Sequence, residues 1–410
     1  MTALRHSSAG GDTQTFQADR RTLGKNSIVC AASALLVGCA GLSAPDAPAI
    51  CTGTYFPVQG DTLTVQSRKT PAQVGLKSGI ATALQNTIKS YPAGAGYAAC
   101  TLPSAARWAL WRHGRLVLYR GSLTANTEIK SARKTIHAAT IGALIQMGKI
   151  TADRTLSHHV KNVWNAQPST VPAENCDLNA TLKQVLVQTS GYADPAKCPG
   201  QEWHYHDSNP PVLNKVAVRA YRGTKATDYT SNYDQVLGTA LFDKVYATDW
   251  STSIQPDGIR IEADLADLGR FGVLMANDGK WGSTQVVPSW FVAKMSQRQT
   301  TGIEPDYEGG MDSVLFPYSP YSPYSLMTWT NSARDLYPGR SPGWTVASGA
   351  EGHYVSWDRG SGLVMVILDS NRCFYPPDLR LGSGAVKLRP VIDTLEANIG
   401  GPDPFAGTCT

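Results

Sequence analysis

Ser131 and Lys134 lie one helical turn apart, in an S-x-x-K tetrad whose residue types suit covalent catalysis. A serine hydroxyl is a weak nucleophile, so it needs a positioned base to take its proton. Residues three apart in a helix share a face, so Lys134 can reach Ser131. A serine in the first turn also meets the positive end of the helix dipole, which stabilises a developing oxyanion. Because the tetrad occurs by chance in many helices, the surrounding sequence has to support this interpretation.

The segments around the tetrad predict the elements that must position it. After Lys134, the run TIHAATIGALIQMGKI has apolar residues at spacings of 3 and 4, which predicts a buried helix ending near Gly148. Before the tetrad, RWALWRHG and RLVLYRG predict a hairpin that turns at His113 and Gly114. From Trp344, TVASGAEGHYVSWD and GLVMVILDS predict further strands, and KLRPVIDTLEANIG predicts a closing helix.

This element order predicts an α/β fold of the α+β kind, in which an antiparallel sheet is flanked by helices and interrupted by a mainly helical domain. The helical stretches of the insertion include ATLKQVLVQTSG and IEADLADLGRFGVLMAND. The expected boundaries are a leader at 1–38, a tether and N-terminal extension at 39–73, an α/β domain at 74–151 and 324–410, and a helical domain at 152–323. Ser131 then lies at a domain junction, where substrate clefts commonly form.

The N-terminal segment predicts export. Ser27 to Gly38 is short and apolar and follows basic residues, as in a signal peptide. Its end, Leu-Val-Gly-Cys at Cys39, resembles a bacterial lipobox, which predicts a lipid-anchored protein of the periplasm or cell envelope. An ordinary secretory signal, or a start codon placed too early, is the alternative. Part of the formal charge of +5 belongs to the leader, which leaves the rest of the chain close to balanced, so a nucleic-acid partner is not indicated.

Six cysteines follow Cys39, and an even number in an exported chain favours disulfides. They permit about 15 pairings. One hypothesis is that nearest neighbours pair, which would fasten the N-terminal extension, a loop before Tyr205 and the C-terminal tail. The six residues are Cys51, Cys100, Cys176, Cys198, Cys373 and Cys409.

From Pro71 to Gly400 the chain resembles the serine β-lactamase and penicillin-binding-protein superfamily, in particular its class C-like esterases and 6-aminohexanoate-dimer hydrolases. The tetrad matches the first family motif. ATLKQVLVQTSGYAD is similar to the family's T-x-x-x-L-L-x-x-T-S-G, and GIRIEADLADLGRFGVLMANDGKWGSTQVVPSWF is a second long match. These long matches are more specific than the tetrad. The resemblance implies a β-lactamase/transpeptidase-like fold and two-step acyl transfer, and we expect no cofactor.

The second family motif, Tyr-x-Asn, corresponds to Tyr205, His206 and Asp207 in PGQEWHYHDSN. The resemblance assigns Tyr205 beside Lys134 as a general base and acid, since a nearby cation favours a phenolate. Asp207 stands where the family usually has asparagine. Its carboxylate either binds Lys134 and keeps it charged or opposes an anionic Tyr205.

The third family motif, Lys-Thr-Gly, aligns with Ala347, Ser348 and Gly349. The resemblance implies that the N–H groups of Ser131 and Ala350, the residue after Gly349, form the oxyanion hole. Gly349 and Asp207 are expected at the pocket. His353 and Trp329 are further pocket candidates, the alternatives being a surface histidine and a core tryptophan. Without the motif's lysine the chain lacks a cation that many penicillin-recognising enzymes use, which favours an ester or a small amide.

Two other patterns point to different chemistry and are less convincing. Gly339 to Gly343 spells G-x-S-x-G, but Pro342 has no N–H to offer an oxyanion, so a turn is the better interpretation. His204 and His206 bracket Tyr205, and His158 and His159 are adjacent, yet no metal-ligand spacing accompanies them, so no metal is expected.

The sequence thus predicts an exported serine hydrolase that acts on a small-molecule ester or amide through Ser131, Lys134 and Tyr205. A β-lactamase or a D-alanyl carboxypeptidase is the nearest alternative. A non-catalytic envelope binding protein with the same fold is the other, because the second and third motifs are both altered.

Overall fold

The computed structural model describes eleven parts of the chain, all of which belong to one compact unit, Ala47–Thr410. They are residues 55–56, 68–89, 106–151, 156–166, 179–192, 197–223, 232–255, 258–305, 321–368, 385 and 388–401. The predicted leader, Cys39 and most of the tether lie outside them. No described helix combines the length and apolar character needed to cross a membrane.

The described chain contains both helices and strands. The α-helices are α1 (Ile80–Lys89), α2 (Arg133–Gln146), α3 (Val160–Trp164), α4 (Leu182–Val187), α5 (Asn209–Arg222), α6 (Tyr233–Leu237), α7 (Leu265–Ala276), α8 (Ser289–Met295) and α10 (Arg389–Ala397). Shorter helical turns are η1 (Ala72–Val74), η3 (Lys130–Ala132), η5 (Gly238–Phe242), η6 (Asp243–Val245) and η7 (Ala350–Gly352). The strands are β1 (Arg107–Arg112), β2 (Arg115–Arg120), β3 (Thr127–Glu128), β4 (Glu202–Trp203), β5 (Ser251–Gln255), β6 (Gly258–Ala263), β7 (Lys280–Trp281), β8 (Thr284–Gln285), β9 (Glu304–Pro305), β10 (Trp329–Thr330), β11 (Trp344–Gly349), β12 (His353–Asp358) and β13 (Leu363–Leu368).

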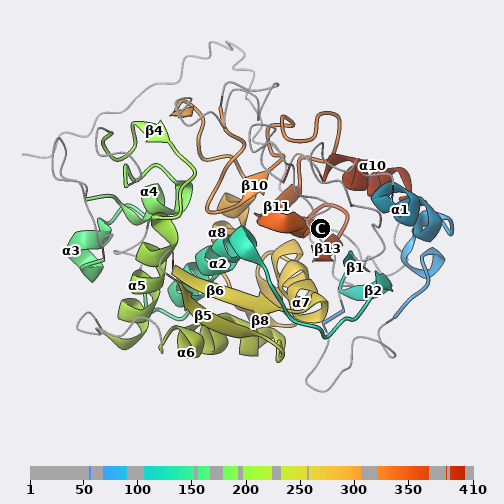
Figure 1. Cartoon of the computed structure of the whole chain (residues 1–410), viewed down its shortest axis with the longest axis horizontal. Helices are drawn as coiled ribbons and strands as arrows, with labels where there is room; N and C mark the ends of the chain where they lie inside the picture. The colour runs from blue at the N-terminus through green and yellow to red at the C-terminus, as the bar shows by residue number, and fades with distance from the viewer. Residues whose placement is uncertain are drawn as a thin grey trace, which may run out of the picture. The chain divides into compact units, whose positions relative to one another are not determined.

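The main sheet is antiparallel and has six strands in the order β10-β11-β12-β13-β1-β2. Within it β1 pairs with β13, so strands from the two ends of the described chain lie side by side (Figure 1). The expected antiparallel sheet is therefore confirmed. A smaller sheet, β3-β6-β5, lies near the start of α2, since β3 runs directly into η3.

The two faces of the main sheet pack against different helices. In β1, Trp108 and Leu110 join the core formed with α1 and α10, whereas Ala109 and Trp111 join the core that contains α2 and α7. Alternate residues of a strand point to opposite faces, so a continuous apolar strand can serve both cores. The α1–α10 pair and α7 accordingly cover opposite faces of the sheet (Figure 1).

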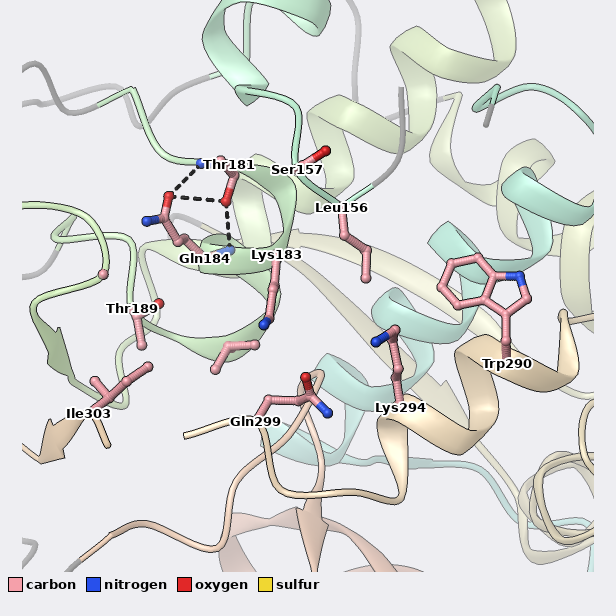
Figure 2. Close-up of a pocket in the computed structure, with 12 residues that line it drawn as sticks. Leu156, Ser157, Thr181, Lys183, Gln184, Thr189, Trp290, Lys294, Gln299 and Ile303 are labelled. Carbon is pink, nitrogen blue, oxygen red and sulfur yellow. Dashed lines mark hydrogen bonds between the residues drawn. The ribbon is translucent and has the colours of Figure 1, made fainter. Parts of the chain in front are cut away.

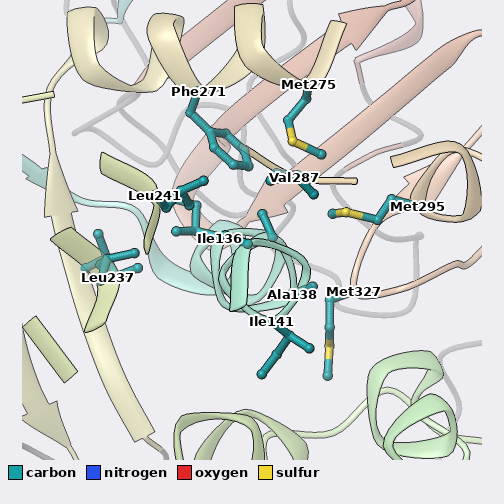
Figure 3. Close-up of a cluster of buried hydrophobic side chains, with 14 of the residues drawn as sticks. Ile136, Ala138, Ile141, Leu237, Leu241, Phe271, Met275, Val287, Met295 and Met327 are labelled. Carbon is teal, nitrogen blue, oxygen red and sulfur yellow. The ribbon is translucent and has the colours of Figure 1, made fainter. Parts of the chain in front are cut away.

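Helix α2 lies in the second core and is buried from Arg133 to Leu144. Side chains from α6, α7 and the Met327 segment surround it (Figure 3). The predicted buried helix is confirmed, and Gly148 takes a left-handed φ of 69° just beyond its end. Because no face of α2 meets solvent, every polar side chain along it has to find a partner inside the protein.

The predicted hairpin is confirmed, but one predicted helix begins too early. His113 and Gly114 form the turn between β1 and β2, with φ values of 44° and 76°. In the IEADLADLGRFGVLMAND stretch, Ile261 to Ala263 are part of β6 rather than helix. The side chain of Asp264 accepts the N–H of Asp267 and so starts α7 there.

The predicted domain boundaries and cysteine pairs stay predictions. Helix α7 lies in the segment expected to form the helical domain, yet it packs on β1, β12 and β13 of the main sheet. Cys198 is disulfide-bonded, and all other cysteines lie outside the described residues.

The close packing of α7 on the sheet can be tested at Gly269. A Cβ added there would lie 2.2 Å from a ring carbon of Trp111. We expect Gly269→Ala to lower the free energy of unfolding in urea by about 1–3 kcal/mol, because overpacking outweighs the gain in helix propensity. Gly79→Ala is the matched control, since its Cβ would meet nothing within 4 Å. Equal stability of the two variants would contradict the packing.

Candidate active site

Lys134 and Ser131 are in direct contact at the start of α2. The Nζ of Lys134 donates a hydrogen bond of 2.8 Å to the Oγ of Ser131. Ser131 lies in η3 and is partly exposed, whereas Lys134 is 1% exposed on the next turn. The spacing in the tetrad thus produces the predicted contact, with the hydroxyl presented outward and the amine behind it.

Asp207 forms the ion pair that Lys134 needs in this buried position. Its Oδ1 is 2.6 Å from the Lys134 Nζ and 3.8 Å from a terminal nitrogen of Arg133. Burial works to raise the pKa of Asp207, but the charge and hydrogen bond of Lys134, helped by Arg133, hold that pKa below its usual range. Of the two alternatives for this residue, the structure has the carboxylate bound to Lys134.

Tyr205 contacts Lys134 through the face of its ring. The Lys134 Nζ is 4.5 Å from the ring centroid, which is a cation–π contact. Tyr205 also packs against Trp329, with centroids 5.7 Å apart, and against Tyr324 at 5.8 Å. Trp203 completes this aromatic group. Trp329 is 5% exposed, so it supports Tyr205 from the core rather than forming an open wall.

Gly349 and η7 lie on the other side of Ser131. A Cβ on Gly349 would come within 2.3 Å of the Ile129 carbonyl oxygen, so the end of β11 is pressed against the turn that carries the serine. Ala350 follows and is exposed in η7, which contacts η3. His353 pairs with Gly349 across the strands and is 1% exposed. Burial, and then the charge of Lys130, lowers its pKa to about 4, so the imidazole is neutral and lies behind the site.

The turn before Ser131 is held by three separate parts of the chain. Lys130 has a φ of 52°, a left-handed conformation that non-glycine residues adopt at a cost. Its Nζ is 2.8 Å from Glu128 in β3 and 3.9 Å from Glu351 in η7. The N–H of Ile129 donates to the Ile261 carbonyl of β6 over 3.1 Å. These contacts fix the backbone that presents the hydroxyl.

His137, one turn beyond Lys134, anchors α2 to the same strand. Its Nε2 is 3.1 Å from the Ile259 carbonyl of β6, so this nitrogen donates and Nδ1 accepts from the Tyr233 hydroxyl. Burial, with added repulsion from Arg133 and Lys134, lowers the pKa of His137 to about 3. The neutral imidazole therefore has a structural role beneath the site.

Gln188 positions the second motif and was not identified from the sequence. Its side-chain oxygen accepts from the N–H of His206 over 3.1 Å and from the Asn209 amide over 2.7 Å. Its backbone carbonyl accepts from the N–H of His204 over 3.0 Å. The only signal in the sequence is its place directly before the Thr-Ser-Gly of the long match. That signal marks a segment but does not reveal what the glutamine binds.

The residues of the two competing patterns have the following surroundings in the structure. In the Gly339–Gly343 segment, the Ser341 hydroxyl donates to Asp358 over 2.8 Å and its N–H donates to Glu396 over 2.8 Å. This serine is therefore fixed in a turn before β11. The His204 and His206 rings are 5.6 Å apart. Within the described ranges, no three His, Cys, Asp or Glu side chains meet in a way that would hold a metal ion.

A sequence comparison now decides the family. The β-lactamase family model matches residues 84–378, which is more than half of the chain. This protein belongs to the β-lactamase family. A search of curated proteins finds no significant match.

Solved structures agree with this β-lactamase family fold. A β-lactamase from Mycobacterium bovis has a TM-score of 0.50 and 17% identity, over 72% of this chain and 96% of that one. A protein from Bacillus anthracis described as a 6-aminohexanoate-dimer hydrolase has a TM-score of 0.51 and 16% identity, over 71% and 79%. EstCE1, a hydrolase with promiscuous acyltransferase activity, has a TM-score of 0.53 and 12% identity, over 79% and 99%. At these identities the likeness establishes the fold.

The close approach of Gly349 to the serine turn can be tested by adding one methyl group. Gly349→Ala must push β11 away from Ile129, which displaces the residues expected to form the oxyanion hole. We expect labelling of Ser131 by a fluorophosphonate to slow by at least about tenfold, as for loss of an oxyanion donor. Gly360→Ala is the control. Its added Cβ would lie 3.7 Å from the nearest atom, a carboxylate oxygen of Asp358, so labelling should stay unchanged. Full labelling of Gly349→Ala would contradict this placement.

Proposed function

We propose that this protein is a serine hydrolase that cleaves an ester or a small amide through an acyl-enzyme at Ser131. The observation that carries the proposal is the 2.8 Å hydrogen bond between Ser131 and the buried Lys134. Family membership and the fold shared with a hydrolase such as EstCE1 support the same reaction class.

In the proposed mechanism, the Oγ of Ser131 attacks the substrate carbonyl carbon while Lys134 takes the hydroxyl proton. The N–H groups of Ser131 and Ala350 stabilise the oxyanion. The tetrahedral intermediate then collapses and its bond to the leaving group breaks. The leaving group receives a proton from the Lys134–Tyr205 pair. Water then attacks the acyl-enzyme, and its proton passes through the same pair to restore Ser131.

The substrate class is narrowed by the third motif. Ala347, which replaces the motif's lysine, is 1% exposed and packs in the core with α2. Lys130, the residue before Ser131 in the chain, is bound to Glu128. A substrate with no obligatory carboxylate suits this arrangement, so we favour an uncharged ester or amide over a penicillin or a D-alanyl peptide.

We also propose that the protein is exported and anchored by a lipid on Cys39 in the cell envelope. The support is the apolar segment before Cys39 and its Leu-Val-Gly-Cys end. The disulfide at Cys198 is consistent with an oxidising compartment.

Removal of the nucleophile is the first test. Ser131→Ala should reduce hydrolysis of a p-nitrophenyl ester to background and abolish fluorophosphonate labelling, because the proposed acyl-enzyme forms on the Oγ that this variant lacks. Ser341→Ala, the serine of the fixed turn, is the control and should keep full labelling. Normal turnover by Ser131→Ala would refute the proposal. Parallel assays with a chromogenic cephalosporin and a D-alanyl amide test the two alternative activities, those of a β-lactamase and of a D-alanyl carboxypeptidase.

The Asp207–Lys134 pair predicts a shift in the pH profile. The carboxylate is ionised throughout the neutral range, because its pKa is below the usual value. It attracts the Nζ of Lys134, which is 2.6 Å away and is the group proposed to take the serine proton. In Asp207→Asn that attraction is gone, so the rising limb of kcat/KM should move to lower pH by about one unit.

Glu351→Gln provides the matched control for this shift. It removes a carboxylate that is also close to Ser131 but is paired with Lys130. Its rising limb should stay in place. The prediction is contradicted if the rising limb of kcat/KM stays in place in Asp207→Asn. It is also contradicted if the limb moves equally in both variants, because the effect would then not come from the Asp207–Lys134 pair.

A further inference from the structure

A second cavity lies apart from Ser131, between α4 and α8. Its volume is about 580 Å³, which is within the range of small-molecule sites. None of Ser131, Lys134, Tyr205 or Asp207 lines it. The described lining residues are Leu156, Ser157, Thr181, Lys183, Gln184, Val187, Thr189, Gly200, Trp290, Lys294, Gln299 and Ile303.

The charge of this cavity is one-sided. Lys183 from α4 and Lys294 from α8 both direct their ammonium groups into the space between the two helices (Figure 2). No aspartate or glutamate is among the described lining residues. The described ion pairs of the protein include neither lysine. Two ammonium groups that face one cavity favour an anion there.

The rest of the lining is largely apolar. Leu156, Val187 and Ile303 provide aliphatic walls, and Trp290 stands at the rim with 42% of its surface exposed. A large exposed tryptophan beside an apolar hollow is a feature of binding sites. Gln184 is already engaged, because its side-chain oxygen accepts from the N–H and the hydroxyl of Thr181. Among the described lining residues, the two lysines are therefore the charged groups that can orient a ligand.

The cavity shares a wall with the segment that positions the second motif. Val187 and Thr189 line it, and Gln188 between them binds the backbone of His204 and His206. On the cavity side, the Gly200 N–H donates to the Thr189 carbonyl over 2.7 Å, and a Cβ on Gly200 would lie 2.9 Å from the Gln184 amide nitrogen. This packing gives the cavity a firm wall separate from the catalytic residues.

From these observations we propose that the α4–α8 cavity is a second binding site, for a small amphipathic carboxylate. The carboxylate would lie between Lys183 and Lys294, and an aliphatic or aromatic body would lie against Leu156, Val187, Ile303 and Trp290. None of the residues proposed to act in the reaction at Ser131 lines this site.

Calorimetric titration with decanoate tests the proposal. Decanoate should bind the wild-type protein, and Lys183→Met with Lys294→Met should weaken binding at least about tenfold, or roughly 1.4 kcal/mol. Lys280→Met, an exposed lysine outside the cavity, should bind as the wild type does. Decanol should bind much more weakly, because it lacks the charge. Trp290→Phe should remove part of the change in tryptophan fluorescence on binding.

Ser131→Ala separates this site from the active site, since its affinity for decanoate should equal that of the wild type. Equal binding by the double lysine variant and the wild type, equal binding of decanol, or absence of binding at millimolar decanoate would overturn the proposal. Loss of decanoate binding in Ser131→Ala would also overturn it, by assigning the ligand to the active site. Thermal unfolding of each variant checks that the fold is kept.

Discussion

The burial of Lys134 is the constraint on which the rest of the site depends. A lysine that is 1% exposed at the start of a buried helix has to be compensated, since an unpaired charge inside a protein costs several kcal/mol. The compensation comes from three groups: the Ser131 hydroxyl, the Asp207 carboxylate and the ring face of Tyr205. One electrostatic requirement thus brings the first and second motifs together.

The loop that supplies two of these partners is itself held by hydrogen bonds from Gln188. Gln188 has a left-handed φ of 66° at the end of α4, which turns its backbone and side chain toward that loop. The Met327 segment links the same region to α2, because its N–H donates to the Leu186 carbonyl and its carbonyl accepts from Thr135. The loop that carries Tyr205 and Asp207 is therefore held by residues outside the proposed catalytic set.

On the other side of Ser131, the main sheet holds the turn that carries the serine. β11 reaches the serine turn only because Gly349 has no Cβ, and Lys130 joins β3 to η7 through Glu128 and Glu351. The sheet in turn depends on β1 pairing with β13, which are more than 250 positions apart in the register Arg107 to Leu368. The two sides of the site are thus assembled from distant parts of the chain and meet at one helical turn.

Short sequence patterns correctly predicted the features that depend on residues close together in the chain. Helical spacing placed Lys134 beside Ser131, turn residues located the β1–β2 hairpin, and Pro342 excluded a nucleophile elbow, since each depends on neighbours within a few positions. The start of α7 was predicted too early because the alternation of Ile259, Ile261 and Ala263 is too short to stand out beside a strong helical period.

The sequence by itself therefore predicted the Ser131–Lys134 contact and determined the family to which the chain belongs. Only the tertiary structure decided which of two roles Asp207 takes, that Gln188 holds the second motif, and that His353 and Trp329 are buried. It alone also placed Lys183 and Lys294 at one cavity. The physical reason is that these properties depend on distances between segments far apart in the chain, and the energy of a buried charge or hydrogen bond is set by such distances.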